Sequence, residues 1–294
     1  MPLAQEEPQV WANNTEHDSV IFADNDYEIF INPDATTHNY KEFEMNARGA
    51  WWDLALKAPY ENGGYENSSR KGAAACCWDD PGLKAATSVV GCKLNEPKTG
   101  PCAGWIAEIA FPLAAISLNN TNSLPPAEGS YWRINFSRVE WKVHAVGNRY
   151  ALDGPANCTW PATHGCGSGN AGDNWVWAPT GMVDIHQPEY WGYVQFSSAK
   201  PNTTAAVKDP TWAIRSVAMQ LYYAQIRAIG CKMTATRGCT GGTGNYTGDL
   251  SLLKSLAPKG PKALDGTCTK VPVVSRKQFA DLIDLICELL DNSC

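Results

Sequence analysis

Hydrophobic and polar residues alternate along several stretches of the first 198 residues, with the period of a β-strand that buries one face. The alternation is clearest in residues 27–31, 43–45, 104–111 and 131–141. Turn-forming triplets such as Asn32-Pro33-Asp34 and Asp80-Pro81-Gly82 separate these stretches. Strands at this spacing are typical of a sandwich rather than of parallel βαβ units. The pattern therefore predicts a mainly β protein, built as an antiparallel β-sandwich.

The pattern changes after residue 198. Residues 199–210 carry Pro and Thr and predict a linker. Apolar residues then recur at helical spacing over 214–229, and again over 279–290 after a suitable N-cap, Ser275. We therefore expect a sandwich over 1–198 and a small α-helical, cysteine-containing appendage over 211–294. A short helix is also expected over 112–116.

Composition and charge exclude two classes of partner. The 294 residues carry a net charge of −6, and lysine and arginine form no stripe. Nucleic-acid binding needs clustered cations, so no nucleic-acid partner is expected. No apolar run approaches the roughly 20 residues that span a membrane, so no membrane span is expected either.

The 11 cysteines lack the ordered Cys/His spacing of a zinc site and favour disulfides instead. Three pairs are close enough to close local loops: Cys92 with Cys102, Cys158 with Cys166, and Cys231 with Cys239. N-glycosylation acceptors begin at Asn13, Asn67, Asn119, Asn135, Asn157, Asn202 and Asn245. These features indicate a secreted glycoprotein. Asn135, within a strand pattern, is the least suitable acceptor.

Three acidic residues precede the first apolar run at alternate positions, namely Asp24, Asp26 and Glu28. In an extended strand all three point to one side, where like charges repel each other. A cation or a hydroxyl-rich ligand would relieve that repulsion, and a structural calcium at Asp24 and Asp26 is the natural candidate. A solvated strand edge explains the same pattern without any ligand. No cofactor is required by the sequence.

The strand pattern over 131–141 ends in charged residues. Strict alternation places Arg138 and Glu140 on the face that carries Trp132. A guanidinium fixed by a carboxylate can donate two hydrogen bonds to neighbouring hydroxyl groups, as a sugar would require. The pair could equally be a structural ion pair.

Residues 173–196 combine aromatic rings with amide and carboxylate groups. Flat rings beside planar polar groups match a pyranose, which has apolar faces and a hydroxyl rim. We therefore place Trp175, Trp177 and His186 among the ligand-binding residues. Core packing is the alternative for this segment, since Trp and Tyr also fill sandwich cores.

Four blocks, at 24–47, 104–112, 131–141 and 174–196, resemble in order and spacing the family 9 carbohydrate-binding modules. The resemblance covers about residues 5–197 and implies a β-sandwich of the DOMON-like, jelly-roll type that binds glycans beside glycoside hydrolase domains. It aligns Phe22 and Ile185 with the two tryptophans that clamp the sugar, and Glu28 with an acidic hydrogen-bonding residue. The family pattern begins some 50 residues earlier, so we expect the first strands and a signal peptide to be missing here.

The sequence thus predicts a secreted, non-catalytic protein that binds a poly- or oligosaccharide during polysaccharide breakdown. Aromatic stacking is assigned to Phe22, Trp175 and Trp177, and hydrogen bonding to Glu28, Arg138, Glu140 and His186. Because some DOMON-like sandwiches hold haem b, the resemblance also implies an alternative, a haem-b-binding redox domain with Met182 and His186 as axial ligands. Glycoside hydrolase activity in the same chain is another.

Overall fold

The fold was analysed in a computed structural model of the 294-residue chain. It describes residues 3–5, 7–69, 78–153, 173–180, 184–200, 203, 205, 212–229 and 247–248. The expected disulfides of Cys158 and Cys231, and the helix after Ser275, lie outside these residues.

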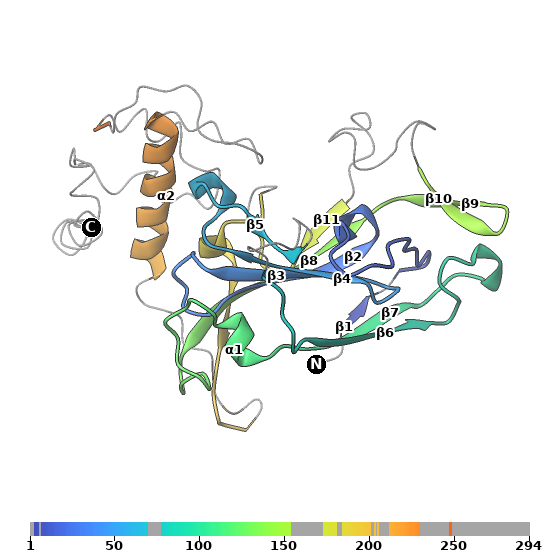
Figure 1. Ribbon diagram of the computed structural model, residues 1–294, viewed down its shortest axis with the longest axis horizontal. Coiled ribbons are helices and arrows are strands. Elements are labelled where there is room, and N and C mark those ends of the chain that lie inside the picture. The colour runs from blue at the N-terminus through green and yellow to red at the C-terminus, as the bar shows by residue number, and fades with distance from the viewer. Residues whose placement is uncertain are drawn as a thin grey trace.

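The described residues form a mainly β protein in which every strand pairing is antiparallel (Figure 1). The large sheet has seven strands in the order β11-β8-β2-β3-β4-β5, with β12 also paired to β8. Its strands are β2 (Asp26–Asn32), β3 (Tyr40–Asn46), β4 (Trp51–Leu56), β5 (Glu66–Asn67), β8 (Tyr131–Glu140), β11 (Asp173–Val176) and β12 (Gly192–Gln195). A small sheet in the order β1-β7-β6 contains β1 (Leu3–Gln5), β6 (Lys84–Val90) and β7 (Gly104–Ala110). A separate hairpin pairs β9 (Val143–Val146) with β10 (Arg149–Leu152).

The two sheets pack face to face as a sandwich (Figure 1). Their core contains Ile29, Phe43 and Trp132 from the large sheet, and Trp105 and Ala107 from the small one. These are the residues that the period of two assigns to one face of each strand, so the predicted strands and faces are confirmed. We call this side of the large sheet the inner face.

The other side of the large sheet, the outer face, is buried as well. It carries a second apolar cluster that includes Phe30, Tyr40 and Trp52. This cluster is covered by the 3-10 helix η1 (Ile21–Ala23) and by residues 184–191, which contain the 3-10 helix η5 (Pro188–Tyr190). Because both faces are covered, the polar residues of β2 and β3 are buried too.

Helices are few in the described part of the chain. The expected short helix is α1 (Leu113–Ile116), and the helical spacing after residue 211 forms α2 (Trp212–Ile229). α2 stands at one end of the large sheet, against η5 and the 3-10 helix η2 (Tyr60–Asn62) (Figure 1). No helix within the described residues is long and apolar enough to cross a membrane.

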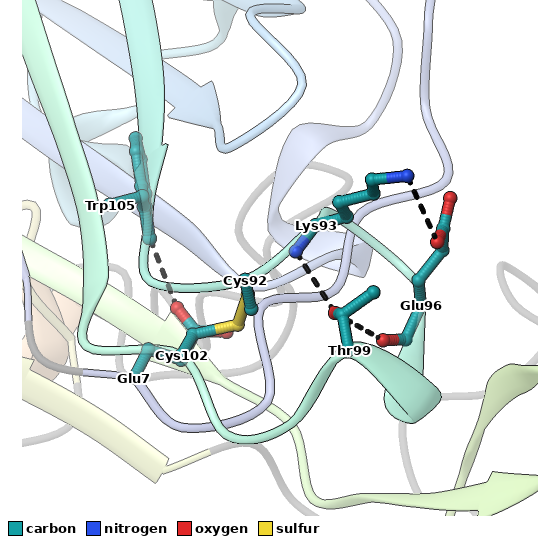
Figure 2. Close-up of a disulfide and its surroundings, with 7 residues drawn as sticks. All are labelled: Glu7, Cys92, Lys93, Glu96, Thr99, Cys102 and Trp105. Carbon is teal, nitrogen blue, oxygen red and sulfur yellow. Dashed lines mark hydrogen bonds and ion pairs between the residues drawn. A yellow bond between two sulfur atoms is a disulfide. The ribbon is translucent and has the colours of Figure 1, made fainter.

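A disulfide closes the connection between β6 and β7, as the spacing of Cys92 and Cys102 predicts. The connection also contains the 3-10 helix η4 (Pro97–Thr99). Figure 2 shows the disulfide beside Glu7 and Trp105. The amide of Cys102 donates to the carbonyl of Pro8 at 3.0 Å, so the bridged loop also holds the N-terminal segment.

Candidate functional site

An exposed aromatic surface lies at the edge of the large sheet formed by β8 and β11. Trp175 and Trp177 are 62% and 54% exposed. Trp175 pairs across the strands with Arg138, and the amide of Trp177 donates to the carbonyl of Phe136 at 2.8 Å. Cross-strand partners share a face, so both rings lie on the inner-face side of the sheet, outside the apolar core. We call Trp175, Trp177, Arg138 and Glu140 the β8/β11 edge.

Trp177 is positioned by its neighbours on β8 and β12. Its ring meets Phe136 edge to face, with centroids 5.6 Å apart. It also lies over Gly192, where a β-carbon would overlap the ring. The small residue at position 192 therefore makes room for the indole, which is fixed although half of it is exposed.

Arg138 and Glu140 form the ion pair that strand alternation allows. Arg138 Nη2 lies 2.6 Å from Glu140 Oε2 and 3.9 Å from Glu7 Oε2. Glu7 accepts hydrogen bonds from Asn25 Nδ2 at 2.6 Å and from Trp105 Nε1 at 3.0 Å. Burial raises the pKa of Glu7, while these donors and Arg138 oppose the rise. The structural ion pair is thus present, and it places two planar charged groups beside Trp175.

A row of acidic side chains lies on the outer face of the central strands. Asp26, Glu28, Glu42 and Glu44 are at most 7% exposed. The expectation of a solvated strand edge was wrong, because β2 lies between β8 and β3 and its outer face is covered. Burial raises the pKa of Glu28 to about 7. Burial also raises the pKa values of Asp26, Glu42 and Glu44, with repulsion from neighbouring carboxylates adding to the effect.

Within this row, carboxylate oxygens of Asp26, Glu28 and Glu44 all lie within 4.8 Å of one another. This set could hold a metal ion. Asp24 is not part of it, because Asp24 Oδ2 accepts from the backbone amides of Asn13 and Asn14 at 2.9 and 2.7 Å. The sequence pattern missed Glu44, although Glu42 and Glu44 alternate with Phe43 and Met45 just as Asp26 and Glu28 alternate with their neighbours.

Phe22 and His186 lie on the outer face, away from the β8/β11 edge. The Phe22 ring stacks on Trp52 with centroids 6.1 Å apart, and its amide donates to Glu44 Oε2 at 3.0 Å. His186 Nδ1 lies 3.1 Å from the hydroxyl of Tyr40 and 3.9 Å from Glu42 Oε2. Burial lowers the pKa of His186 to about 4. The structure thus separates the predicted ligand residues into two groups on opposite faces.

A second group of potential metal ligands was not predicted from the sequence. His17 Nε2 lies 2.7 Å from Asp53 Oδ1, 3.3 Å from Asp18 Oδ1 and 3.7 Å from Asp79 Oδ1. Asp53 and Asp18 are buried, whereas His17 and Asp79 are exposed. His17 and Asp18 are adjacent in the sequence, but Asp53 and Asp79 come from two distant positions, so no local motif unites the group. Met182, the second ligand of the haem alternative, lies outside the described residues.

Comparisons with known proteins give distant likenesses. No protein-family model matches the sequence, and no curated protein matches it significantly. The structure is similar to that of a candidate carbohydrate-binding protein from Bacteroides uniformis, with 14% identity, 67% of this chain and 70% of that chain covered, and a TM-score of 0.35. It is also similar to a family 9 carbohydrate-binding module from Caldicellulosiruptor kristjanssonii in complex with cellotriose, with 10% identity, 71% and 73% covered, and a TM-score of 0.36. Both TM-scores are below 0.5, and we draw no functional conclusion from either.

Proposed function

We propose that the protein binds carbohydrate at the β8/β11 edge. The observation that carries this proposal is the pair of tryptophans on the inner-face side of the sheet edge, Trp175 in β11 and Trp177 directly after it, each more than half exposed. Large aromatic rings are normally buried, so two neighbouring exposed rings favour a binding surface. The adjacent Arg138–Glu140 pair supplies a donor group and an acceptor group at the rim of that surface.

The spacing of the rings favours an oligosaccharide over a single sugar. Alternate residues of a strand are about 7 Å apart, so the indoles of Trp175 and Trp177 can each contact a different ring of a glycan chain. β11 is the outermost strand on its side of the sheet, and a chain of sugars can extend past it. Arg138 and Glu140 would bond hydroxyl groups of the sugar that lies over Trp175.

Phe22, Glu28 and His186 do not belong to this surface. Glu28 is 7% exposed and lies under the cover of the outer face. The ring of His186 packs against Tyr60 and Phe30, with centroids 4.4 and 5.7 Å away. These side chains therefore support the fold around the outer face, and the proposed sugar contacts come from the inner-face side alone.

Replacing Trp175 with alanine tests the proposal. Each ring contributes about 1 kcal/mol of stacking beyond the burial of its area, so we expect the dissociation constant to rise at least about fivefold. Affinity electrophoresis on soluble β-glucans, xylans and mannans would identify the glycan, and titration calorimetry with its oligosaccharides would measure affinity. Tyr65→Ala is the matched control, since Tyr65 is an aromatic residue that is 70% exposed directly before β5. This variant should bind as the wild type does.

Two results would contradict the proposal: no retention on any glycan, or unchanged affinity in a Trp175→Ala/Trp177→Ala double variant that keeps its melting temperature. We further propose that binding occurs without hydrolysis. The same glycans should then release no reducing sugar on incubation with the protein.

A further inference from the structure

Three carboxylates meet at the centre of the large sheet, on its outer face. Asp26 and Glu28 come from β2, and Glu44 is the cross-strand partner of Glu28 on β3. Their exposed fractions are 0%, 7% and 2%. The group is fixed by two central strands rather than by loops, so its geometry is set by the sheet itself.

One oxygen of this group has no hydrogen-bond partner among the residues that the structure describes. Asp26 Oδ1 accepts from the amide of Val139 at 3.0 Å, but Asp26 Oδ2 is buried and accepts from no described residue. A buried carboxylate oxygen without a donor costs several kcal/mol unless something else satisfies it. The nearest carboxylates, Glu28 and Glu44, offer only acceptor oxygens when they are ionised.

The outward oxygens of the group are held by donors around it. Glu44 Oε2 accepts from the amide of Phe22 at 3.0 Å, and Glu28 accepts from the hydroxyl of Ser137. Hydrogen bonds of this kind orient carboxylates that ligate metals. The charges that act most strongly on Asp26 are those of Glu28, Asp24 and Glu42, all of them acidic.

We propose that Asp26, Glu28 and Glu44 bind a calcium ion. The ligands are all carboxylate oxygens, which hard cations prefer to the nitrogen and sulfur ligands of zinc sites. Oxygens around calcium lie 2.3–2.6 Å from the ion, so opposite ligands are about 5 Å apart, in keeping with the 4.8 Å limit of this group. Magnesium keeps several of its waters, which suits a closed site poorly.

The ion would join three parts of the fold. β2 and β3 supply the ligands, and the amide of Phe22 links Glu44 to η1 in the cover of the outer face. Calcium would thus stabilise the protein, and it lies on the face opposite the proposed sugar contacts. The proposal does not depend on carbohydrate binding.

Thermal melting in calcium and in EDTA tests the site. At a calcium concentration a hundredfold above the dissociation constant, the wild-type melting temperature should rise by about 5–10 °C relative to EDTA. Glu44→Gln should remove this rise. In EDTA the same variant should melt at or above the wild-type temperature, because the glutamine amide is neutral without having to take up a proton at this buried position. Glu108→Gln, at an exposed position of β7, is the control and should keep the full rise.

The emission of bound terbium provides a second test, in which no ligand residue has to be substituted. Trp52 is the cross-strand partner of Glu44, so its indole should sensitise the emission of Tb³⁺ bound at the site. Calcium should displace the terbium, and Trp52→Phe should reduce the emission without removing the melting shift in calcium. His17→Ala should change neither result, because His17 belongs to the separate group with Asp53.

Absence of both the melting shift and calcium-sensitive terbium emission would overturn the proposal. So would a shift that His17→Ala removes and Glu44→Gln leaves intact, since the ion would then bind at the other group. Loss of sugar binding in Trp175→Ala has no bearing on either outcome.

Discussion

At the scale of single residues, Glu189 is a buried carboxyl group in an unusual environment. It is 1% exposed, and neither carboxyl oxygen accepts a hydrogen bond from another described residue. Burial raises its pKa to about 8, and Glu61 adds to the rise while Arg133 opposes it. Asp184 also raises the pKa. The folded protein therefore holds a proton here that the unfolded chain releases.

Glu189→Gln should flatten the pH dependence of stability. The folded pKa of about 8 exceeds the ordinary value of 4.5, so this group's contribution is complete below pH 4.5 and is lost as pH rises through 8. Between pH 5 and pH 8 the wild type should lose about 3 kcal/mol of unfolding free energy more than the variant. Urea unfolding at several pH values measures this, with Glu108→Gln as control. Parallel curves for wild type and Glu189→Gln would contradict it.

Contacts between side chains were predictable from the sequence where both residues lie on the same strand. The period of two placed Arg138 and Glu140 on one face, and their 2.6 Å contact follows from that placement. The acids of β2 were interpreted wrongly because their burial depends on η1 and on residues 184–191, which are distant in sequence. No local pattern in residues 24–28 shows that another segment covers them.

At the scale of elements, the β6–β7 hairpin connects the disulfide to the proposed site. Its bridged loop binds the carbonyls of Pro8 and Val10 through the amides of Cys102 and Asn95. Glu7, next to Pro8, contacts Trp105 and Arg138. Lys93 and Glu96 form an ion pair at 3.8 Å within the loop (Figure 2), but both are exposed and such pairs contribute little.

Replacing Cys92 and Cys102 with serine should destabilise the protein. Closing a loop of this length removes entropy from the unfolded chain worth about 3 kcal/mol, given the sequence separation of 10. We expect the urea midpoint to fall accordingly while circular dichroism keeps its β signature. The double variant is preferable to a reductant, which would act on all 11 cysteines. An unchanged midpoint would show that the bridge does not constrain the unfolded chain.

At the scale of the whole molecule, the alternation of apolar residues was enough to predict a sandwich but not its asymmetry. The small sheet covers only the inner face, and α2 and the cover of the outer face complete the burial. Helical spacing located α2 correctly, whereas its position against η2 and η5 depends on contacts between distant segments. The hydroxyl of Tyr222 donates to Asn62 Oδ1 of η2, and Leu221 and Tyr223 are buried side chains of α2.

A chain ending at residue 198 should fold but be less stable. Removing α2 exposes the surface that Leu221 and Tyr223 cover, which should lower the unfolding free energy by about 3–5 kcal/mol. Thermal melting of the shortened and full chains measures the difference, and circular dichroism checks that strands persist. Equal melting temperatures would mean that α2 adds nothing to the sandwich, and loss of all β structure would refute the predicted boundary.

Strand β8 pairs with both β11 and β12, the two strands that precede and follow the connection between them. It pairs with β11 at Ser137–Glu140 and with β12 at Tyr131–Ile134, and the ring of Trp177 lies over Gly192 where the connection returns. Loops with fixed ends tolerate changes in length, since each doubling costs only about 0.6 kcal/mol of closure entropy. Insertions between the two anchors should therefore leave both pairings in register, so that the β8/β11 edge and the cover of the outer face can diverge separately during evolution.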